Sequence, residues 1–170
     1  MIRRRTGFWV LWVVLFAWRA WAAEPLFVID RSLNRNQVVY ELNLSDANGM
    51  AENPVRVYWV LHEDNGRVEE LSSLEQGFAY GVSIRKQEAE ELRFVLKALP
   101  KKEIVVLRRK GGGFVAVTEI AGHPAFIKSI FIKSIGSGIF SSVRYVEVNG
   151  LSVDGEERVV ERIVPKRAFG

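Results

Sequence analysis

The chain has 170 residues, 24 of them basic and 20 acidic, with two histidines and no cysteine. The lack of cysteine excludes disulfides, thiolate nucleophiles, cysteine-ligated metals and an N-terminal lipid anchor. The net charge of +4 suggests a nucleic-acid binder, but four basic residues and no acidic ones lie in residues 1–22. Residues 23–170 hold 20 residues of each sign, and this balance argues against nucleic-acid binding.

Residues 1–22 are typical of a cleaved export signal. Arginines at positions 3–5 precede an apolar run over residues 7–17, and Ala20-Trp21-Ala22 has the small-x-small pattern that signal peptidase reads. The apolar run is about a dozen residues long, whereas a membrane-spanning helix needs roughly 17 to 25. We therefore expect cleavage after Ala22, a periplasmic or secreted protein and no stable membrane span. An uncleaved anchor is the alternative, because Arg19 is unusual so close to a cleavage site.

Residues 23–170 are expected to form a single all-β domain. Alternation of apolar and polar residues with a period of two indicates half-buried strands. It is regular over residues 37–44, 55–61 and 92–98, and less regular over 26–30, 78–84, 104–108, 114–120, 125–135, 143–148 and 158–164. No segment between these runs is long enough for the crossover helices of a parallel sheet. The sequence therefore predicts an antiparallel barrel or sandwich of about ten strands with one short helix.

Glycine-containing turns separate the expected strands, since glycine and asparagine tolerate the positive φ that tight hairpins need. The turn signals are Asn48-Gly49, Asn65-Gly66, Gly111-Gly112-Gly113, Asn149-Gly150 and Asp154-Gly155. The one helical signal is Ser72-Ser73-Leu74-Glu75, a capping box in which Ser72 and Glu75 satisfy each other's backbone amides. Gly77 would end this short helix.

A five-residue repeat, FIKSI, occupies residues 126–130 and again 131–135. In a regular strand Lys128 and Lys133 would face opposite sides of the sheet. We expect either a bulge near Ile130–Phe131, which returns both lysines to one face, or a bend of the strand between two sheets.

Several short strings together resemble the exported bacterial family catalogued as domain of unknown function 4833. They are Phe27–Ser32, Asn34–Asn36, Asn53–Val55, Val57–Trp59, Leu74-Glu75 with Ala79–Gly81, and Gly122–Lys128. The resemblance extends over nearly all of the chain that follows the leader. It implies an exported single domain with no established activity, and hence no catalytic residues to transfer.

Motifs for catalysis or metal binding are weak. His62 and His123 are the only histidines, fewer than the three or four converging ligands of a zinc site, so we expect no metal and no cofactor. No Gly-x-Ser-x-Gly nucleophile elbow is present. Glu75 is the best single candidate for a general acid, although the capping box already explains it. The basic run before Gly111 is read as a charged hairpin end rather than an anion site.

The candidate ligand-binding residues are Tyr58, Glu75 and Tyr80. Small residues at Ala79, Gly81 and Ser83 would permit close approach of another element or leave room for a ligand. If Tyr58 or Tyr80 points inward, its hydroxyl becomes a polar group in an apolar cavity.

The favoured function is an exported, non-enzymatic binding or accessory protein of the cell envelope. Its partner would be a small lipophilic ligand or an envelope protein. One alternative is an envelope hydrolase, which requires Glu75, Tyr58, Tyr80 or a histidine to converge in one cleft. The other alternative is a structural protein in which Phe126–Ile135 is a free edge for strand addition.

Overall fold

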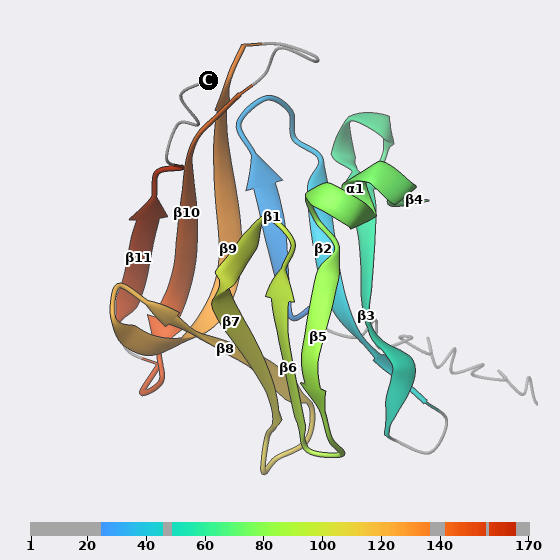
Figure 1. The fold of residues 1–170 in the computed structure, drawn as a ribbon, viewed down its shortest axis with the longest axis vertical. Coiled ribbons are helices and arrows are strands. Elements are labelled where there is room, and N and C mark those ends of the chain that lie inside the picture. Colours follow the sequence, from blue (N-terminus) through green and yellow to red (C-terminus); the bar gives the residue numbers. More distant parts are fainter. Residues whose placement is uncertain (1–24, 46–48, 137–141, 156, 166–170) are drawn as a thin grey trace, which may run out of the picture.

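The computed structural model describes residues 25–45, 49–136, 142–155 and 157–165 (Figure 1). The expected leader over residues 1–22 and Asn48 of the first turn signal lie outside the described residues. The strands are β1 (Phe27–Arg31), β2 (Gln37–Leu44), β3 (Met50–Leu61), β4 (Arg67–Glu70), β5 (Val82–Gln87), β6 (Glu91–Leu96), β7 (Leu99–Arg108), β8 (Phe114–Ile120), β9 (His123–Ile135), β10 (Ser142–Ser152) and β11 (Arg158–Ile163). The helical pieces are α1 (Ser73–Phe78) and a 3-10 turn, η1 (His62–Asp64). Within the described ranges, no helix is long and apolar enough to cross a membrane.

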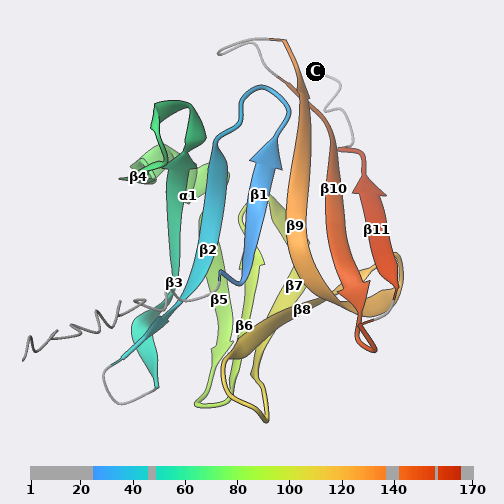
Figure 2. The same cartoon turned by 180° about the vertical axis from the view of Figure 1, so that it is seen from behind.

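All the described strands belong to one curled sheet, which confirms the all-β prediction. Its main path runs β4-β3-β2-β1-β9-β8-β7-β6-β5, and β10 with β11 continues from the other side of β9. The sheet folds over at β9, so that β5 to β8 form a second layer facing β1, β2 and β9 (Figures 1 and 2). The end strands β4 and β5 are not paired with each other, so the fold is an open half-barrel.

The sheet bends at strand β9, which has strand neighbours on both of its sides. Its first residues pair with β8, residues 129–132 pair with β1, and β10 runs along its other side. Phe126–Ile135 is therefore paired with β10 on one side and, at residues 126 and 129–132, with β8 and β1 on the other. This pairing disfavours the alternative in which the segment is a free edge for strand addition.

The predicted bulge in the FIKSI repeat exists, but it lies at Lys128. Ser129 is opposite Asn149 and Ile127 is opposite Gly150, so Lys128 is the extra residue. The buried positions accordingly change spacing from Ile127 to Ile130. Because a bulge inserts one residue into the alternation, Lys128 and Lys133 both lie on the outer side of the half-barrel.

The Asn149-Gly150 signal does not form the expected turn and lies inside β10, beside this bulge. A Cβ atom on Gly150 would lie 2.6 Å from the carbonyl oxygen of Phe126 and 2.6 Å from Cδ1 of Ile120. Glycine is therefore needed there for close approach of two strands rather than for a positive φ. Two hairpin turns were not predicted: Ala121-Gly122, with φ angles of 52° and 83°, and Lys97-Ala98, which lies inside the expected strand over residues 92–98.

The pairing of β1 with β9 is parallel, in contrast to the purely antiparallel expectation. A parallel pair needs a long connection, and no segment between consecutive strands is long enough to provide one. In this fold the connection consists of β2 to β8, which separate β1 from β9 in the chain. The sequence also missed β4, a four-residue edge strand in which every residue is exposed.

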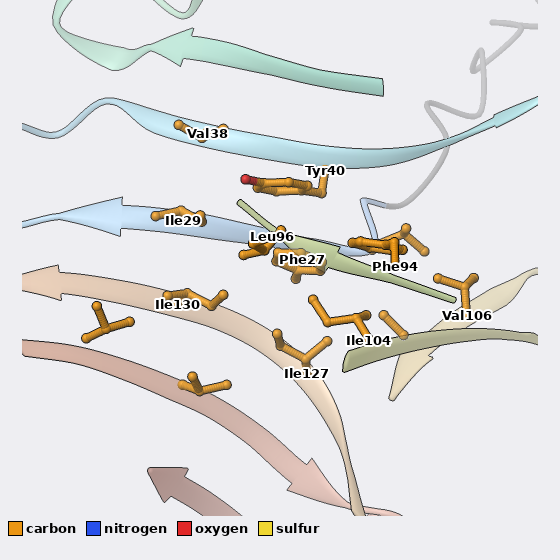
Figure 3. Close-up of a cluster of buried hydrophobic side chains, with 14 of the residues drawn as sticks. Phe27, Ile29, Val38, Tyr40, Phe94, Leu96, Ile104, Val106, Ile127 and Ile130 are labelled. Atoms are coloured by element: carbon orange, nitrogen blue, oxygen red, sulfur yellow. The ribbon is translucent and has the colours of Figure 1, made fainter. Parts of the chain in front are cut away.

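The core lies between the two layers of the half-barrel. Inner-face side chains of β1, β2 and β9 meet those of β6 and β7, as Figure 3 shows for Phe27, Tyr40, Phe94 and Ile127. The rings of Phe27 and Tyr40 stack with their centroids 4.4 Å apart. Both side chains are almost completely buried, so the apolar contact between the layers is the main stabilising contribution here.

Candidate ligand-binding site

A cavity of about 500 Å³ lies between the two layers. Its lining includes Phe78 of α1, the helix that lies at one end of the half-barrel in Figure 1. Its lining is mainly apolar, with one guanidinium, one phenol and one serine among the described residues. The lining residues are Ile29, Arg31, Phe78, Ala79, Tyr80, Leu96, Ala98, Leu99, Ile130, Ile132, Ser134, Val143, Val146, Ile163 and Pro165. Concave, mostly apolar surfaces with a few polar groups are typical of small-molecule sites.

One wall of this cavity is a row of four directly paired residues. Arg31 of β1 is opposite Ile132 of β9, Ile132 is opposite Val146 of β10, and Val146 is opposite Ile163 of β11. Neighbouring strands are roughly 4.8 Å apart, so the row is about 14 Å long. We call these four residues the cavity row. It starts at a cation and continues through three aliphatic side chains.

Arg31 is the charged residue among the described lining residues. It follows Phe27 and Ile29 in the inward-facing alternation of β1, so its side chain continues the row of buried residues. The guanidinium carbon lies 5.6 Å from the centroid of the Trp59 ring. Among the described residues, no carboxylate lies within 4 Å of the Arg31 guanidinium. Its hydrogen-bond donors are therefore available to a ligand.

Tyr80 borders the cavity beside Arg31. Its backbone oxygen accepts a 2.6 Å hydrogen bond from the hydroxyl of the buried Tyr40, which crosses from one layer to the other. Burial raises the pKa of the Tyr80 hydroxyl, and the nearby charge of Arg31 only partly opposes this. Tyr80 consequently stays protonated at neutral pH and can donate a hydrogen bond.

Glu75 does not line the cavity, but it holds α1 in place beside it. One carboxylate oxygen accepts from Nε1 of Trp59 at 3.1 Å, and the other accepts from the backbone amide and hydroxyl of Ser72. The predicted capping box is therefore confirmed. Burial alone would raise the pKa of Glu75, but these hydrogen bonds and the charge of Arg31 lower it. An ionised, fully engaged carboxylate is a poor general acid.

Tyr58 lies apart from Glu75 and Tyr80. It precedes Trp59 on β3, and successive strand residues face opposite sides of the sheet. On the outer face its ring stacks under the guanidinium of Arg56, 4.7 Å from the ring centroid. Burial and the neighbouring Glu41 carboxylate raise the pKa of the Tyr58 hydroxyl. The structure thus brings Glu75 and Tyr80 together around Trp59 and places Tyr58 elsewhere.

The two histidines also lie away from the cavity lining. Nε2 of His62 is 2.8 Å from Oε1 of Gln37, and His123 is exposed at the start of β9. Within the described ranges, no group of three His, Asp or Glu side chains is close enough to hold a metal ion. The convergence that a hydrolase requires is therefore not assembled from Glu75, Tyr58, Tyr80 and a histidine.

The residue that sequence reasoning missed is Arg31. Its signal was present, because Phe27, Ile29 and Arg31 share one face of a strand and the first two are strongly apolar. A charged side chain on a strand face that is otherwise apolar is unusual unless the charge has a functional role. The aliphatic partners of Arg31 were not predictable in the same way, because they come from strands about 100 residues later in the chain.

A second hollow of about 510 Å³ lies where the half-barrel is open, between β3 and β5. We call this gap the seam. The hollow is lined by polar as well as apolar residues of β3, β4 and β5, including Asn53, Arg56, Glu70 and Val82. The amide of Gln87 bridges the seam by donating to the backbone oxygen of Ala51. The lining of this second hollow contains both a cation and an anion, Arg56 and Glu70, whereas the described lining of the cavity between the layers contains one cation.

Comparison with known families gave one match. The family described as Domain of unknown function (DUF4833) matches residues 27–162. A search of curated proteins found no match, and a search of solved structures found none either.

Proposed function

Given that the chain belongs to the Domain of unknown function (DUF4833) family, we propose that it is an exported, non-enzymatic binding protein of the bacterial cell envelope. It holds a small lipophilic ligand between the two layers of its half-barrel. The observation that supports this most is the cavity of about 500 Å³ with a mainly aliphatic and aromatic lining. A volume of this size is typical of small-molecule sites.

Export is proposed from the leader sequence. The arginines at positions 3–5, the apolar run over residues 7–17 and the Ala20-Trp21-Ala22 site form a signal-peptide pattern. In a bacterium with two membranes the mature protein would reside in the periplasm, and with one membrane it would be secreted. A soluble carrier for apolar molecules suits either compartment, because such molecules cross water poorly on their own.

The hydrolase alternative has less support. Glu75 is held by Ser72 and Trp59 and its pKa is lowered, which suits an ionised structural carboxylate rather than a proton donor. Tyr58 and His62 lie on the outer side of the sheet, away from Tyr80. An active site would need these groups within about 3 Å of a common substrate atom.

Native mass spectrometry tests the proposal. Protein starting at Ala23 is purified gently from the exported fraction and measured before and after denaturation. We expect a discrete extra mass that disappears on denaturation. A bare protein mass, together with no uptake of added apolar ligands, would contradict the proposal.

A cavity-filling variant links such a mass to the cavity. Ala98 lines the cavity, so Ala98→Phe should reduce the bound fraction. The neighbouring Lys97 is exposed and is not among the lining residues, so Lys97→Phe adds the same ring outside the cavity and should leave binding unchanged. Equal binding by the two variants would place the ligand elsewhere.

The seam between β3 and β5 favours a second candidate, in which an envelope protein adds a strand to this half-barrel. Strand β4 pairs only with Tyr58–Leu61, so among the described strands residues 50–57 of β3 have no neighbour on that side. Strand β5 pairs only with β6. Two edges that border a hollow of about 510 Å³ are a typical acceptor for an extended peptide.

Site-directed crosslinking separates the two candidates, because the chain has no native cysteine. A photoreactive label on Ser83→Cys in β5 should capture one discrete envelope protein if strand addition occurs. The same label on Ser142→Cys in β10, far from the seam, should not capture it. Equal crosslinking at the two positions, or none, would contradict strand addition at the seam.

A further inference from the structure

The cavity between the layers is polar at one end of the cavity row and apolar along the rest of it. Arg31, at the β1 end, and Tyr80, whose hydroxyl feels the charge of Arg31, are lining residues that carry hydrogen-bond donors. Ile132, Val146 and Ile163 supply only hydrocarbon along the remaining length. A ligand that matches both parts has an acceptor at one end and an apolar chain behind it.

The acceptor is expected to be an anion, because among the described residues no acidic side chain lies within 4 Å of the Arg31 guanidinium. Arg31 is half-buried, and a partly desolvated cation gains from a directly bound partner of opposite charge. The charge of Glu75 interacts with that of Arg31, but Glu75 is held by Trp59 and Ser72 and does not line the cavity. A ligand anion would complete the pair.

The head group is expected to carry a single charge. The described lining contains one cation, and the ionised Glu75 close by disfavours a second negative charge. The guanidinium presents parallel N–H donors that match the two oxygens of a planar carboxylate. The protonated Tyr80 hydroxyl can donate to a remaining lone pair of the same group.

The dimensions of the cavity row favour an unbranched chain of moderate length. From Arg31 to Ile163 the row extends over three strand spacings, or about 14 Å. The opposite wall consists of Leu96, Leu99 and the segment from Phe78 to Tyr80. That segment is fixed to the β6–β7 turn by backbone hydrogen bonds from Lys97 to Gly81 and from Ala98 to Ala79.

We infer that the ligand is an amphiphile with one carboxylate, whose head group is bound by Arg31 and Tyr80 and whose chain lies along Ile132, Val146 and Ile163. This inference rests on the proposed function, since it assigns the chemical class of the ligand in the same cavity. Arg31 is the residue that determines specificity, and the aliphatic part of the row supplies affinity for any chain of suitable length.

Calorimetric titration of delipidated protein starting at Ala23 tests the inference. The probes are dodecanoate, dodecanol and dodecyl phosphate, which share one chain and differ in the head group. We expect dodecanoate to bind roughly 10- to 100-fold more tightly than dodecanol at neutral pH, which is the usual effect of a charged hydrogen bond. Dodecyl phosphate should bind more weakly than dodecanoate, because its second charge faces Glu75.

Two variants at one position assign the preference to Arg31. Arg31→Met keeps an unbranched apolar side chain and removes the charge, so it should abolish the preference for dodecanoate, whereas dodecanol, whose neutral hydroxyl gains less from Arg31, should lose much less affinity. Arg31→Lys keeps the charge without the paired donors, and it should retain only part of the preference. Retained dodecanol binding, with a far-UV circular dichroism spectrum like that of the wild type, shows that each variant is folded.

The outcomes separate failure of the inference from failure of the proposed function. Equal binding of dodecanoate and dodecanol, or a preference that survives Arg31→Met, would overturn the carboxylate assignment while the cavity remains a ligand site. Tighter binding of dodecyl phosphate would replace the carboxylate by a phosphate head group. If none of the three probes binds the wild-type protein, the proposed function itself fails.

Discussion

Arg31 of β1 lies directly opposite Ile132 of β9 in the parallel pair at the centre of the half-barrel. This pairing places a permanent positive charge on an inner face that is otherwise mainly apolar, next to a cavity of about 500 Å³. Arg31 is half-buried, and charges are uncommon on such a face because desolvation of an ion is costly. The exception at Arg31 therefore indicates a binding role more than a stabilising one.

Arg31→Met should therefore change the stability of the ligand-free protein little, although it changes ligand binding strongly. The variant loses the cation–π contact with Trp59, worth roughly 0.5–1 kcal/mol, and the attraction between Arg31 and Glu75, and the smaller desolvation cost of a neutral side chain offsets part of this loss. We expect the free energy of unfolding of the ligand-free protein to fall by no more than about 1 kcal/mol. Urea unfolding checks this, and a loss of several kcal/mol would mean that Arg31 is primarily structural.

Glu75→Gln should destabilise the protein by about 1 kcal/mol at pH 7, since it weakens the capping box and the bond to Trp59. The pKa of Glu75 is lowered in the folded protein from the ordinary value of 4.5. Its contribution to stability is therefore present above that value and is lost as the pH falls through the folded-state pKa. The difference in the free energy of unfolding between the wild type and Glu75→Gln should therefore shrink in acid.

Urea unfolding at pH 7 and at acid pH measures this difference. Glu52→Gln is the matched control, because Glu52 is exposed on β3 and its substitution should have no effect at either pH. A difference between wild type and Glu75→Gln that stays constant with pH would show that the carboxylate charge is not what holds α1.

Gly81→Ala should destabilise the connection between α1 and β5. A Cβ atom on Gly81 would lie 1.8 Å from the carbonyl oxygen of Gln76, so the backbone must move. We expect a loss of about 1–3 kcal/mol and a shift in the fluorescence of Trp59, the only tryptophan in residues 23–170. Gly77→Ala is the control in α1, since nothing lies within 4 Å of its added Cβ. Equal effects of the two substitutions would contradict close packing at Gly81.

The Lys102–Glu161 ion pair should contribute more than the exposed pairs. Their side chains are only 14% and 27% exposed, and the same Glu161 oxygen accepts from the amide of Ala121 in the β8–β9 turn. Burial raises the pKa of Glu161, but Lys102 and this amide lower it overall. We expect a coupling energy of about 1–2 kcal/mol at neutral pH, above the roughly 0.2–1 of surface pairs.

A double-mutant cycle of Lys102→Met and Glu161→Gln measures this coupling. The reference cycle is Arg67→Met with Asp64→Asn, a pair whose side chains are more than half exposed. Because the pKa of Glu161 is lowered on folding, the Lys102–Glu161 coupling should be full above about pH 4.5 and fade as the pH falls further. Couplings of equal size in the two cycles would show that burial adds nothing.

Local patterns in the sequence identified the elements but not their partners. The alternation in β2, β3 and β6 and the capping box at Ser72 depend on neighbouring residues, and these were predictable. Asn149-Gly150 was misread because the same dipeptide suits a hairpin turn and a glycine beside a bulge. Only the contact of Gly150 with Phe126 separates the two, and it joins distant parts of the chain.

Only part of the site was predictable, because only some of its residues are close together in the sequence. Tyr80 and Glu75 are close in sequence and do lie near each other around Trp59, whereas the side of the sheet that Tyr58 faces depended on the register of β3. The cavity row needs three pairings among four strands, and one of them is parallel. No local pattern encodes such pairings, so Arg31 could not be matched with Ile132 in advance.

Quenching of Trp59 by brominated dodecanoates is the most direct test of ligand binding in this orientation. Trp59 is next to Arg31 and is the only tryptophan of the protein starting at Ala23, so it reports on the head-group end of the cavity row. We predict strong quenching by 2-bromododecanoate and weak quenching by 12-bromododecanoate, whose bromine would lie about 14 Å farther along the row. Equal quenching by the two probes, stronger quenching by the 12-bromo probe, or none would contradict the proposed binding mode.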